Sequence, residues 1–439
     1  MHKLVSFVSL GCAKNRVNTE QMMFRLRQAG YLVSGDTDGA DVVVLNTCGF
    51  VGSAKTEAID NILELAELKK SGTIGKLVVA GCLPQRYKDD ILTELPEIDA
   101  VVGTGSFDDI VSVINALWES TDKLVRFGDI SAPVSETGRI LSTSPVWAYI
   151  KISEGCDNRC AYCCIPDIRG SFRSRPMENI IKEAGELVNN GVRELILVAQ
   201  DTTMYGLDLY GERKLTELLR ELGAIEKLRW IRLLYLYPND IDNQLIDEIS
   251  KNGKIVKYLD IPIQHISDNI LSKMNRRGTG DEIRSLLKTL RERIDGLVLR
   301  TSVITGLPGE GEEEFTLLYE FLKEFKFERT GVFAYSPEEG TAAALMERPP
   351  EDVAQQRASL IYQLGTDIME SFDKSRVGSV ITVLTDAYGE ADYVTARSYA
   401  ETPEVDGEIR VVGDDVKFNT FIDIRVVGIK NGELVGEQV

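Results

Sequence analysis

Short apolar runs alternate with longer amphipathic segments through most of this 439-residue chain, and this alternation constrains the fold more than any other feature. Strands that alternate with helices form parallel sheets, because each helix carries the chain back to start the next strand beside the last. We therefore predict an open parallel α/β domain at residues 1–125. Its strand-like runs are residues 4–10, 41–46 and 76–80, and its helix-like segments are residues 15–29 and 53–70.

A larger series of the same kind occupies residues 143–374, after a segment at 126–142 that lacks periodicity and that we interpret as a linker. Six strand–helix units fit a partial (β/α)6 barrel, in which chemistry belongs at the carboxyl ends of the strands. The strand-like runs are residues 146–152, 194–199, 231–235, 258–261, 297–304 and 331–335, and the helix-like segments include 177–190, 214–222, 241–249, 282–294 and 312–325.

Residues 375–439 change to a period of two, with short runs at 380–384, 393–397, 409–412 and 421–429. Strands in series with no helix between them predict a small antiparallel β-barrel, a kind of domain that often recognises a substrate. From Arg376 onward the segment carries six Lys and Arg against twelve Asp and Glu. A domain that holds RNA is expected to carry the opposite sign.

Three cysteines follow the first strand of the central series at a C-x3-C-x2-C spacing: Cys156, Cys160 and Cys163. Thiolates are the usual protein ligands of iron–sulfur clusters, and three ligands leave a coordination position open, as in catalytic metal sites. The alternatives are a zinc knuckle, a disulfide framework or buried cysteines. Zinc would want a fourth ligand, and the two histidines, His2 and His265, are far from this loop in sequence. We interpret the adjoining Cys164 as structural, because using it as a ligand would break the spacing.

Cys12, Cys48 and Cys82 each lie one or two residues beyond the end of a predicted strand of the first domain. The carboxyl ends of parallel strands share one edge of a sheet, where ligands bind. Three thiols that are far apart in sequence would therefore converge there. We predict a second three-cysteine cluster site, and the alternative is three unrelated buried cysteines.

The net charge and the absence of targeting signals in the sequence indicate which partners and which compartment to expect. No apolar run approaches the ~20 residues that a membrane span needs, and the first residues lack the features of a signal peptide. We expect a cytoplasmic protein without membrane contact, in which thiols stay reduced. The net charge of −19 argues against nucleic-acid binding and favours a basic partner.

The cysteine loop, with Tyr162 before its third cysteine, resembles the radical S-adenosylmethionine (SAM) superfamily. The resemblance implies that Cys156, Cys160 and Cys163 hold a [4Fe-4S] cluster whose free iron binds SAM and whose electron cleaves it to a 5′-deoxyadenosyl radical. Tyr162, Gln200 and Gly306 are then candidate SAM contacts, although Gln200 and Gly306 are equally compatible with ordinary residues at strand ends. His265 is a possible general base or a hydrogen-bonded residue of the barrel edge.

Over its whole length the chain resembles the methylthiotransferases, with a TRAM-type barrel at the end. The motifs that carry the resemblance to the RimO type are Ser9-Leu10-Gly11-Cys12-Ala13-Lys14-Asn15, Asn46-Thr47-Cys48-Gly49-Phe50, Gly155-Cys156-Asp157-Asn158-Arg159-Cys160, Ile165-Pro166 and Ile168-Arg169-Gly170. The MiaB type, which acts on tRNA adenosine, typically has Gln-Met-Asn where this chain has Ala13-Lys14-Asn15.

The RimO resemblance implies a methylthio group added to the β-carbon of an aspartate in small-subunit ribosomal protein twelve. Cys12, Cys48 and Cys82 would hold an auxiliary [4Fe-4S] cluster that delivers sulfur, a second SAM would supply the methyl group, and an external donor the electrons. We do not expect direct nucleic-acid binding. The alternatives are a MiaB-type tRNA methylthiotransferase and a non-catalytic iron–sulfur electron carrier, which would not cleave SAM.

Overall fold

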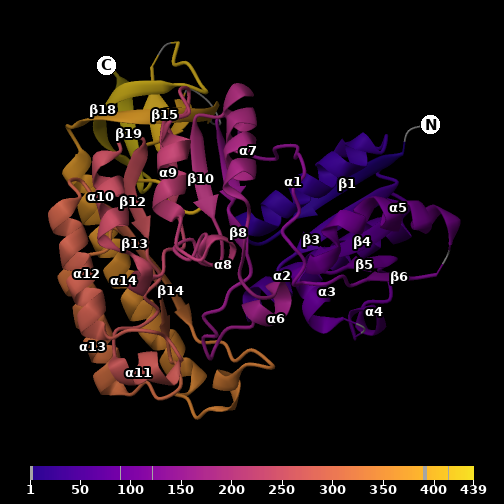
Figure 1. Cartoon of the computed structure of the whole chain (residues 1–439), viewed down its shortest axis with the longest axis horizontal. Coiled ribbons are helices and arrows are strands. Elements are labelled where there is room, and N and C mark those ends of the chain that lie inside the picture. The colour runs from indigo at the N-terminus through magenta and orange to yellow at the C-terminus, as the bar shows by residue number, and fades with distance from the viewer. Residues whose placement is uncertain (1–2, 89, 121, 389–392, 414) are drawn as a thin grey trace.

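The computed structural model describes the chain except for residues 1–2, 89, 121, 389–392 and 414. It contains two six-stranded sheets, a closed barrel and a two-stranded sheet. The N-terminal sheet lies to one side of the larger central sheet, and the barrel sits at one end of the central domain (Figure 1). No helix in the described part of the chain is both long enough and apolar enough to cross a membrane.

The N-terminal sheet is entirely parallel, as predicted, and has the strand order β2-β1-β3-β4-β5-β6. The strand order reverses between β1 and β3, and ligands bind at such a switch point. Its strands are β1 (Leu4–Ser9), β2 (Leu32–Ser34), β3 (Val42–Thr47), β4 (Lys76–Gly81), β5 (Ala100–Val102) and β6 (Leu124–Arg126).

Helices cover both faces of this sheet, which is why β3 is buried along its whole length. α1 (Ala13–Gln28) and α5 (Ile110–Glu119) pack on one face, and α2 (Gly52–Lys70) packs on the other. The strands β2, β5 and β6 were not predicted, because three residues are too few for a periodic pattern. The remaining helices are α3 (Cys82–Tyr87), α4 (Asp90–Glu94) and the 3-10 helix η1 (Thr104–Asp109).

The central sheet is also parallel, in the order β7-β10-β11-β12-β13-β14, and its two edge strands do not meet. It therefore forms the predicted partial barrel, with all six strands in place. The strands are β7 (Trp147–Lys151), β10 (Glu194–Val198), β11 (Trp230–Leu233), β12 (Ile255–Asp260), β13 (Val298–Thr305) and β14 (Arg329–Ala334).

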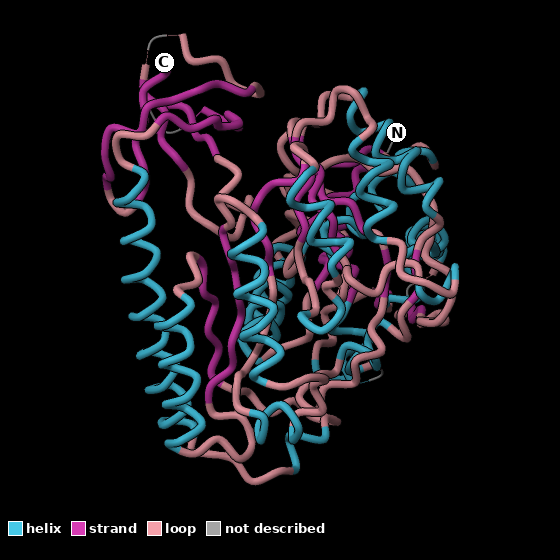
Figure 2. The backbone as a smooth tube through the Cα atoms, turned by 60° about the vertical axis from the view of Figure 1, so that its left-hand side comes forward, coloured by secondary structure: helices cyan, strands magenta, loops and turns pink. Residues whose placement is uncertain are grey.

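Amphipathic helices cover the outside of the central sheet and share one apolar core with it. The long helix α14 (Glu351–Arg376), which the sequence analysis did not identify, leads to the strands of the C-terminal barrel (Figure 2). The main helices are α7 (Met177–Asn189), α9 (Leu215–Gly223), α10 (Asn243–Lys251), α12 (Gly280–Arg293) and α13 (Glu312–Phe325). The shorter elements are β8 (Ser153–Glu154), β9 (Arg173–Ser174), α6 (Ile165–Arg169), α8 (Leu207–Tyr210), α11 (Asp268–Lys273), η2 (Pro238–Asp240) and η3 (Ala342–Leu345).

The C-terminal strands close into a barrel in the order β15-β16-β17-β19-β18. One detail of the prediction was wrong: β17 and β19 pair in parallel, because the long antiparallel hairpin of β18 and β19 brings the last strand back beside β17 in the same direction. The strands are β15 (Val380–Tyr388), β16 (Tyr393–Arg397), β17 (Ile409–Val412), β18 (Phe421–Lys430) and β19 (Glu433–Gln438).

Several acidic residues of the barrel are not displayed to solvent but join it to the central domain. Glu401 is buried against Arg376 of α14 and Arg329 of β14, 3.2 Å away. In the opposite sense, the barrel residue Arg397 reaches the buried Glu194 of β10 at 2.9 Å. The acidic count of this segment therefore overstates its acidic surface. Three of the counted residues, Glu390, Asp392 and Asp414, lie outside the described residues.

Candidate active site between two sets of thiols

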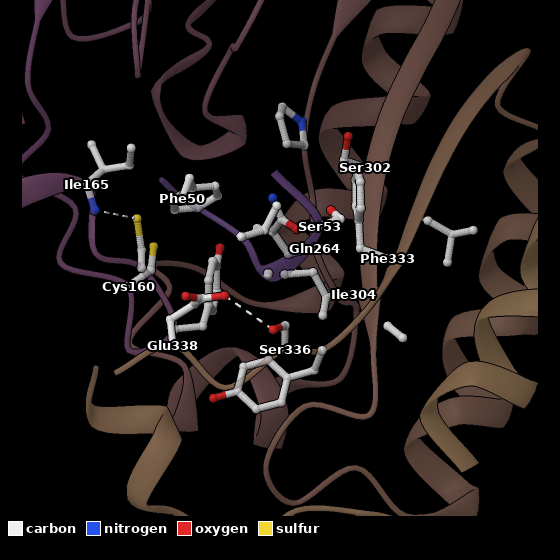
Figure 3. A pocket seen from close by; sticks show the side chains of 18 of the residues that line it. Phe50, Ser53, Cys160, Ile165, Gln264, Ser302, Ile304, Phe333, Ser336 and Glu338 are labelled. Carbon is white, nitrogen blue, oxygen red and sulfur yellow. Dashed lines mark hydrogen bonds between the residues drawn. The ribbon is translucent and has the colours of Figure 1, made fainter. Parts of the chain in front are cut away.

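A single cavity of about 1390 Å³ opens where the carboxyl ends of the two parallel sheets face each other. The predicted cysteines of both sets line it: Cys12, Cys48, Cys82, Cys156, Cys160 and Cys163. Figure 3 shows Cys160 and Ile165 at one side of this cavity, Ser302 and Phe333 at the other, and Phe50 and Ser53 of the N-terminal domain between them. The structure thus brings together thiols that are up to 151 positions apart in sequence.

The loop set, Cys156, Cys160 and Cys163, is shaped by a glycine at its start. Gly155 has φ +81°, and a Cβ there would lie 2.0 Å from the carbonyl oxygen of Ser171. Only glycine allows this turn and this close approach. The turn directs the loop into the cavity immediately beyond β8.

Nitrogen donors surround the sulfurs of the loop set. The Asn158 side-chain amide lies 3.5 Å from the sulfur of Cys156, and the backbone N–H of Ile165 lies 3.5 Å from that of Cys163. The guanidinium of Arg276 reaches the sulfur of Cys160 at 3.9 Å. Hydrogen bonds of this kind orient thiolate ligands and tune the metal that they hold.

Burial makes Cys156 and Cys163 hard to ionise as free thiols. Burial, with smaller contributions from the charges of Asp201 and Cys160, raises the pKa of Cys156 to about 11. The pKa of Cys163 is raised still more, by burial and by its neighbours Cys160, Cys164 and Cys156. A negative charge on one thiolate raises the pKa of a neighbouring thiol, so these thiols lie near one another. A metal bound by several of them stabilises their thiolate forms.

The strand-end set, Cys12, Cys48 and Cys82, is assembled by the sheet. Cys12 precedes α1, Cys48 follows β3 and Cys82 opens α3 directly after β4, so the first two flank the switch point of the strand order. Gly11 has φ +83°, and a Cβ there would lie 2.7 Å from the Cβ of Cys48. The absence of a side chain at Gly11 lets the two strand ends approach.

The charges around the strand-end set differ from thiol to thiol. Burial raises the pKa of Cys48 to about 12, with contributions from Cys82 and Cys12. The pKa of Cys12 is lowered instead: burial raises it, but the charges of Lys14 and Arg169 outweigh burial. All three thiols of this set lie on the wall of the same cavity.

The donor set fits iron–sulfur clusters better than single ions. All seven cysteines are free thiols, so none is used in a disulfide. In the described part of the chain, no three His, Cys, Asp or Glu side chains are gathered tightly enough to hold one metal ion. A cluster holds its thiolates further apart than a single zinc ion does. Two sets of three sulfurs on the wall of one cavity match that larger group.

Arg169, which the sequence analysis quoted only within a motif, joins the two sets. It is 3% exposed and comes from α6, after the cysteine loop. Its guanidinium hydrogen-bonds Asn15, and it lies 3.3 Å from the sulfur of Cys82 and 3.2 Å from the carboxylate of Glu154. Glu154 in turn accepts hydrogen bonds from Lys151 and Gln200. Burial would raise the pKa of Glu154, but the charges of Lys151 and Arg169 hold it far below its usual range.

The three candidate SAM contacts, Tyr162, Gln200 and Gly306, all line the cavity. Tyr162 accepts a hydrogen bond from Arg276 at 3.1 Å, and the Gly306 N–H donates to Glu310 at 2.9 Å. Gln200 donates to Glu154, and its side-chain oxygen is buried without a hydrogen-bond partner. That orphaned oxygen is the acceptor that a bound ligand can satisfy.

His265 and Cys164 lie outside this arrangement. His265 is fully buried, accepts a hydrogen bond from the N–H of Ser267 and lies 3.4 Å from Glu310. It is not among the residues that line the cavity, so it is a hydrogen-bonded barrel residue. Cys164 is buried and directs its thiol toward the carbonyl oxygen of Phe50, 3.8 Å away.

Two cavity residues have an unusual backbone that the sequence did not reveal. Tyr235 has φ +60° and Gln264 has φ +66°. Tyr235 is held by hydrogen bonds from Thr202 to its carbonyl and from its own N–H to Asp260, and Gln264 pairs with β13. A left-handed conformation in a non-glycine residue costs energy and clusters at functional sites. A tyrosine and a glutamine at strand ends give no sequence signal for it.

Three family models match successive parts of the chain. Residues 150–322 match the Radical SAM superfamily, residues 4–103 match the uncharacterized protein family UPF0004, and residues 377–439 match the TRAM domain. The UPF0004 match covers the strand-end thiols, and the Radical SAM match covers the loop thiols.

Curated relatives match over the full length. The chain is 46% identical, over 100% of its length and 99% of the relative, to the ribosomal protein uS12 methylthiotransferase RimO of Acetivibrio thermocellus. It is 44% identical, over 99% of both chains, to the protein of the same name from Desulforamulus reducens.

Among solved structures, the radical SAM methyltransferase TsrM from Kitasatospora setae has a TM-score of 0.58 at 14% identity. That match covers 79% of this chain and 74% of TsrM. The cobalamin-dependent radical SAM enzyme OxsB has a TM-score of 0.51 at 13% identity, covering 82% of this chain and 56% of OxsB. At these identities the likeness is one of fold.

Proposed function

The chain belongs to the RimO family of radical SAM methylthiotransferases, and from this premise we propose that it adds a methylthio group to the β-carbon of an aspartate in ribosomal protein uS12. The observation that carries the proposal is that both thiol sets line one cavity. A group bound at one set and a group bound at the other can then act on the same substrate atom. A pure electron carrier has no need for such a shared cavity.

Two [4Fe-4S] clusters fit the two donor sets. Cys156, Cys160 and Cys163 would hold one, and Cys12, Cys48 and Cys82 the other. When bound, the first supplies reductive cleavage of SAM and the second supplies sulfur, so the hard chemistry is that of the cofactors. An external protein would deliver the electrons. The proposed SAM contacts are three residues that line the cavity: Gln200, whose side-chain oxygen is unpaired, Tyr162 and Gly306.

The protein's own residues position the two thiol sets and exclude water from the cavity. Arg169 ties the cysteine loop to the strand-end domain through Asn15 and Cys82, which fixes the two sets relative to each other. Apolar side chains of the cavity wall, among them Phe50, Leu234 and Phe333, limit the water that could quench a radical. The buried contacts of the barrel with the central domain hold residues such as Thr402 and Val405 at the cavity.

The net charge of −19 supports a basic protein partner over a nucleic acid. Ribosomal proteins are basic because they bind RNA. We propose that the substrate is recognised as a protein, without direct binding of nucleic acid, and that the enzyme works in the cytoplasm. Part of the acidic charge of the barrel is buried at domain contacts, so the charge that favours a basic partner is that of the whole chain and not that of the barrel alone.

The test is a direct competition between the two candidate substrates. Anaerobically reconstituted enzyme is incubated with SAM, a reductant and an equimolar mixture of purified uS12 and unmodified tRNA, and each is analysed by mass spectrometry. We expect one methylthio group on an aspartate of uS12 and none on tRNA. A gain on tRNA alone would contradict the substrate, and no cleavage of SAM would contradict the radical reaction.

A further inference from the structure

Lys14 reaches from the first turn of α1 into the cavity, across the boundary between the N-terminal and central domains. The residue is 8% exposed, and its ammonium lies 3.5 Å from the centroid of the Tyr235 ring. Tyr235 presents that ring from its left-handed turn at the end of β11. A cation over an aromatic face is stabilised, but the ring does not neutralise its charge.

The other cations of the cavity wall already have partners or face solvent. Arg300 pairs with Asp260 at 2.8 Å, and Arg169 pairs with Glu154. Arg276 donates to the carbonyl oxygen of Pro262 at 2.8 Å and to Tyr162, and Arg348 is exposed at the rim. In the described part of the chain, no carboxylate lies within ion-pair distance of Lys14. A buried charge without an ionic partner is costly.

We propose that Lys14 binds the side-chain carboxylate of the substrate aspartate and so sets the preference for an acidic residue. The inference rests on the proposed function, which places an aspartate in this cavity. A carboxylate held by the ammonium leaves its adjoining β-carbon in the cavity that both thiol sets line, because Lys14 is two residues from Cys12 and its ammonium lies over the Tyr235 ring in that cavity. The N-terminus of α1 adds to the positive potential at this point.

Two other anions could occupy the same place. One is the strand-end cluster, because the charge of Lys14 is already felt at Cys12. The other is the carboxylate of SAM. Each predicts a different consequence of removing the ammonium: loss of iron in the first case and weaker SAM binding in the second. The carboxylate of the substrate predicts neither, and it alone predicts a change in the choice between aspartate and asparagine.

The experiment compares wild type, Lys14→Met and Lys14→Arg on uS12 and on uS12 with the target aspartate replaced by asparagine. Methionine keeps an unbranched side chain, one atom shorter, and removes its charge. Lys70→Met is the matched control, because Lys70 is exposed at the end of α2 and pairs with the exposed Glu67. The readouts are kcat/KM for each substrate, iron content and the affinity for SAM.

A charge-assisted hydrogen bond favours its correct partner by about tenfold to a hundredfold. We expect wild type and Lys70→Met to prefer the aspartate protein by that factor. Lys14→Met should lose the preference, because its kcat/KM should fall on the aspartate protein and change little on the asparagine protein. Lys14→Arg should restore part of the preference. Iron content and SAM affinity should stay at the wild-type level in all variants.

The inference is overturned if Lys14→Met keeps the preference, if it slows both substrates equally, or if it loses iron or SAM affinity. The proposed function survives those outcomes, because wild type would still modify uS12. If wild type modifies neither substrate protein, the proposed function fails and the inference fails with it.

Discussion

The two thiol sets reach one cavity by opposite routes. Cys156, Cys160 and Cys163 lie on a single loop, so eight consecutive residues hold the whole set. Cys12, Cys48 and Cys82 come from three separate strand ends and meet only because the strands are parallel neighbours. The loop set is therefore a local site, whereas the strand-end set depends on the fold of an entire domain. Variants that disturb one route should spare the other.

The largest effects should follow loss of a single thiol. Cys160→Ala is expected to abolish formation of 5′-deoxyadenosine, because that thiol belongs to the proposed SAM-binding set. Cys48→Ala is expected to retain SAM cleavage and to reduce methylthiolated product to background. Chromatography of the nucleoside and mass analysis of uS12 in the same samples would check this. If both variants lose SAM cleavage alike, the two sets do not have separate roles.

The next effect concerns the residue that joins the two sets. Arg169→Gln removes a buried guanidinium that faces Glu154, Asn15 and Cys82, so it leaves a buried carboxylate with less compensation. We expect a loss of about 3–5 kcal/mol in the free energy of unfolding, together with weaker retention of the strand-end iron. Denaturant unfolding and iron analysis measure these two quantities. Arg220→Gln, at an exposed arginine that pairs with Glu248, is the matched control and should change both very little.

A smaller effect is expected where the barrel meets the central domain. Glu401→Gln removes one of the carboxylates that face Arg376 and Arg329 in a buried contact, and Asp373 remains beside both arginines. Burial would raise the pKa of Glu401, but the two arginines outweigh it and hold the pKa at about 2, so this carboxylate is ionised at neutral pH. The loss should be about 2 kcal/mol, seen as faster hydrogen exchange at β16 and the segment after it. Unchanged exchange there would show that this contact does not hold the barrel in place.

The smallest effect sharpens the definition of the loop set. Cys164 adjoins Cys163 but turns its thiol toward Phe50, away from the donors that surround the other three sulfurs. Cys164→Ala should keep the iron content and SAM cleavage of wild type and cost no more than about 1 kcal/mol of stability. If Cys164→Ala loses iron and Cys163→Ala does not, Cys164 is the ligand and the assignment of Cys163 is wrong.

The same contrast explains what could be predicted from the sequence. The loop set can be predicted from the sequence because the spacing of its cysteines alone defines it. The strand-end set can be predicted because Cys12, Cys48 and Cys82 follow apolar runs whose parallel pairing could be inferred. The six central strands were equally clear, since each is a short run of strand-forming residues next to a helix-like segment. The three-residue strands β2, β5 and β6 were missed because they are too short to show a period.

Features that depend on tertiary contacts gave no signal. The sequence marks Lys14 and Arg169 as motif residues, but only the packing of the two domains places the first over Tyr235 and the second beside Cys82. The left-handed turns of Tyr235 and Gln264 are imposed by hydrogen bonds with neighbouring strands. Likewise, the number of charged residues in the barrel does not reveal that Glu401 is buried in ion pairs with Arg329 and Arg376.

The most direct test of the account is the iron bound by two triple variants. Wild type, the variant with Cys12, Cys48 and Cys82 changed to alanine, and the variant with Cys156, Cys160 and Cys163 changed to alanine are reconstituted in parallel and analysed by Mössbauer spectroscopy with and without SAM. We predict that each triple variant keeps about half of the wild-type iron as a [4Fe-4S] cluster, and that SAM alters the spectrum only where the loop set is intact. If either variant loses all of its iron, or keeps all of it, the thiols do not form two independent cluster sites and the central claim is wrong.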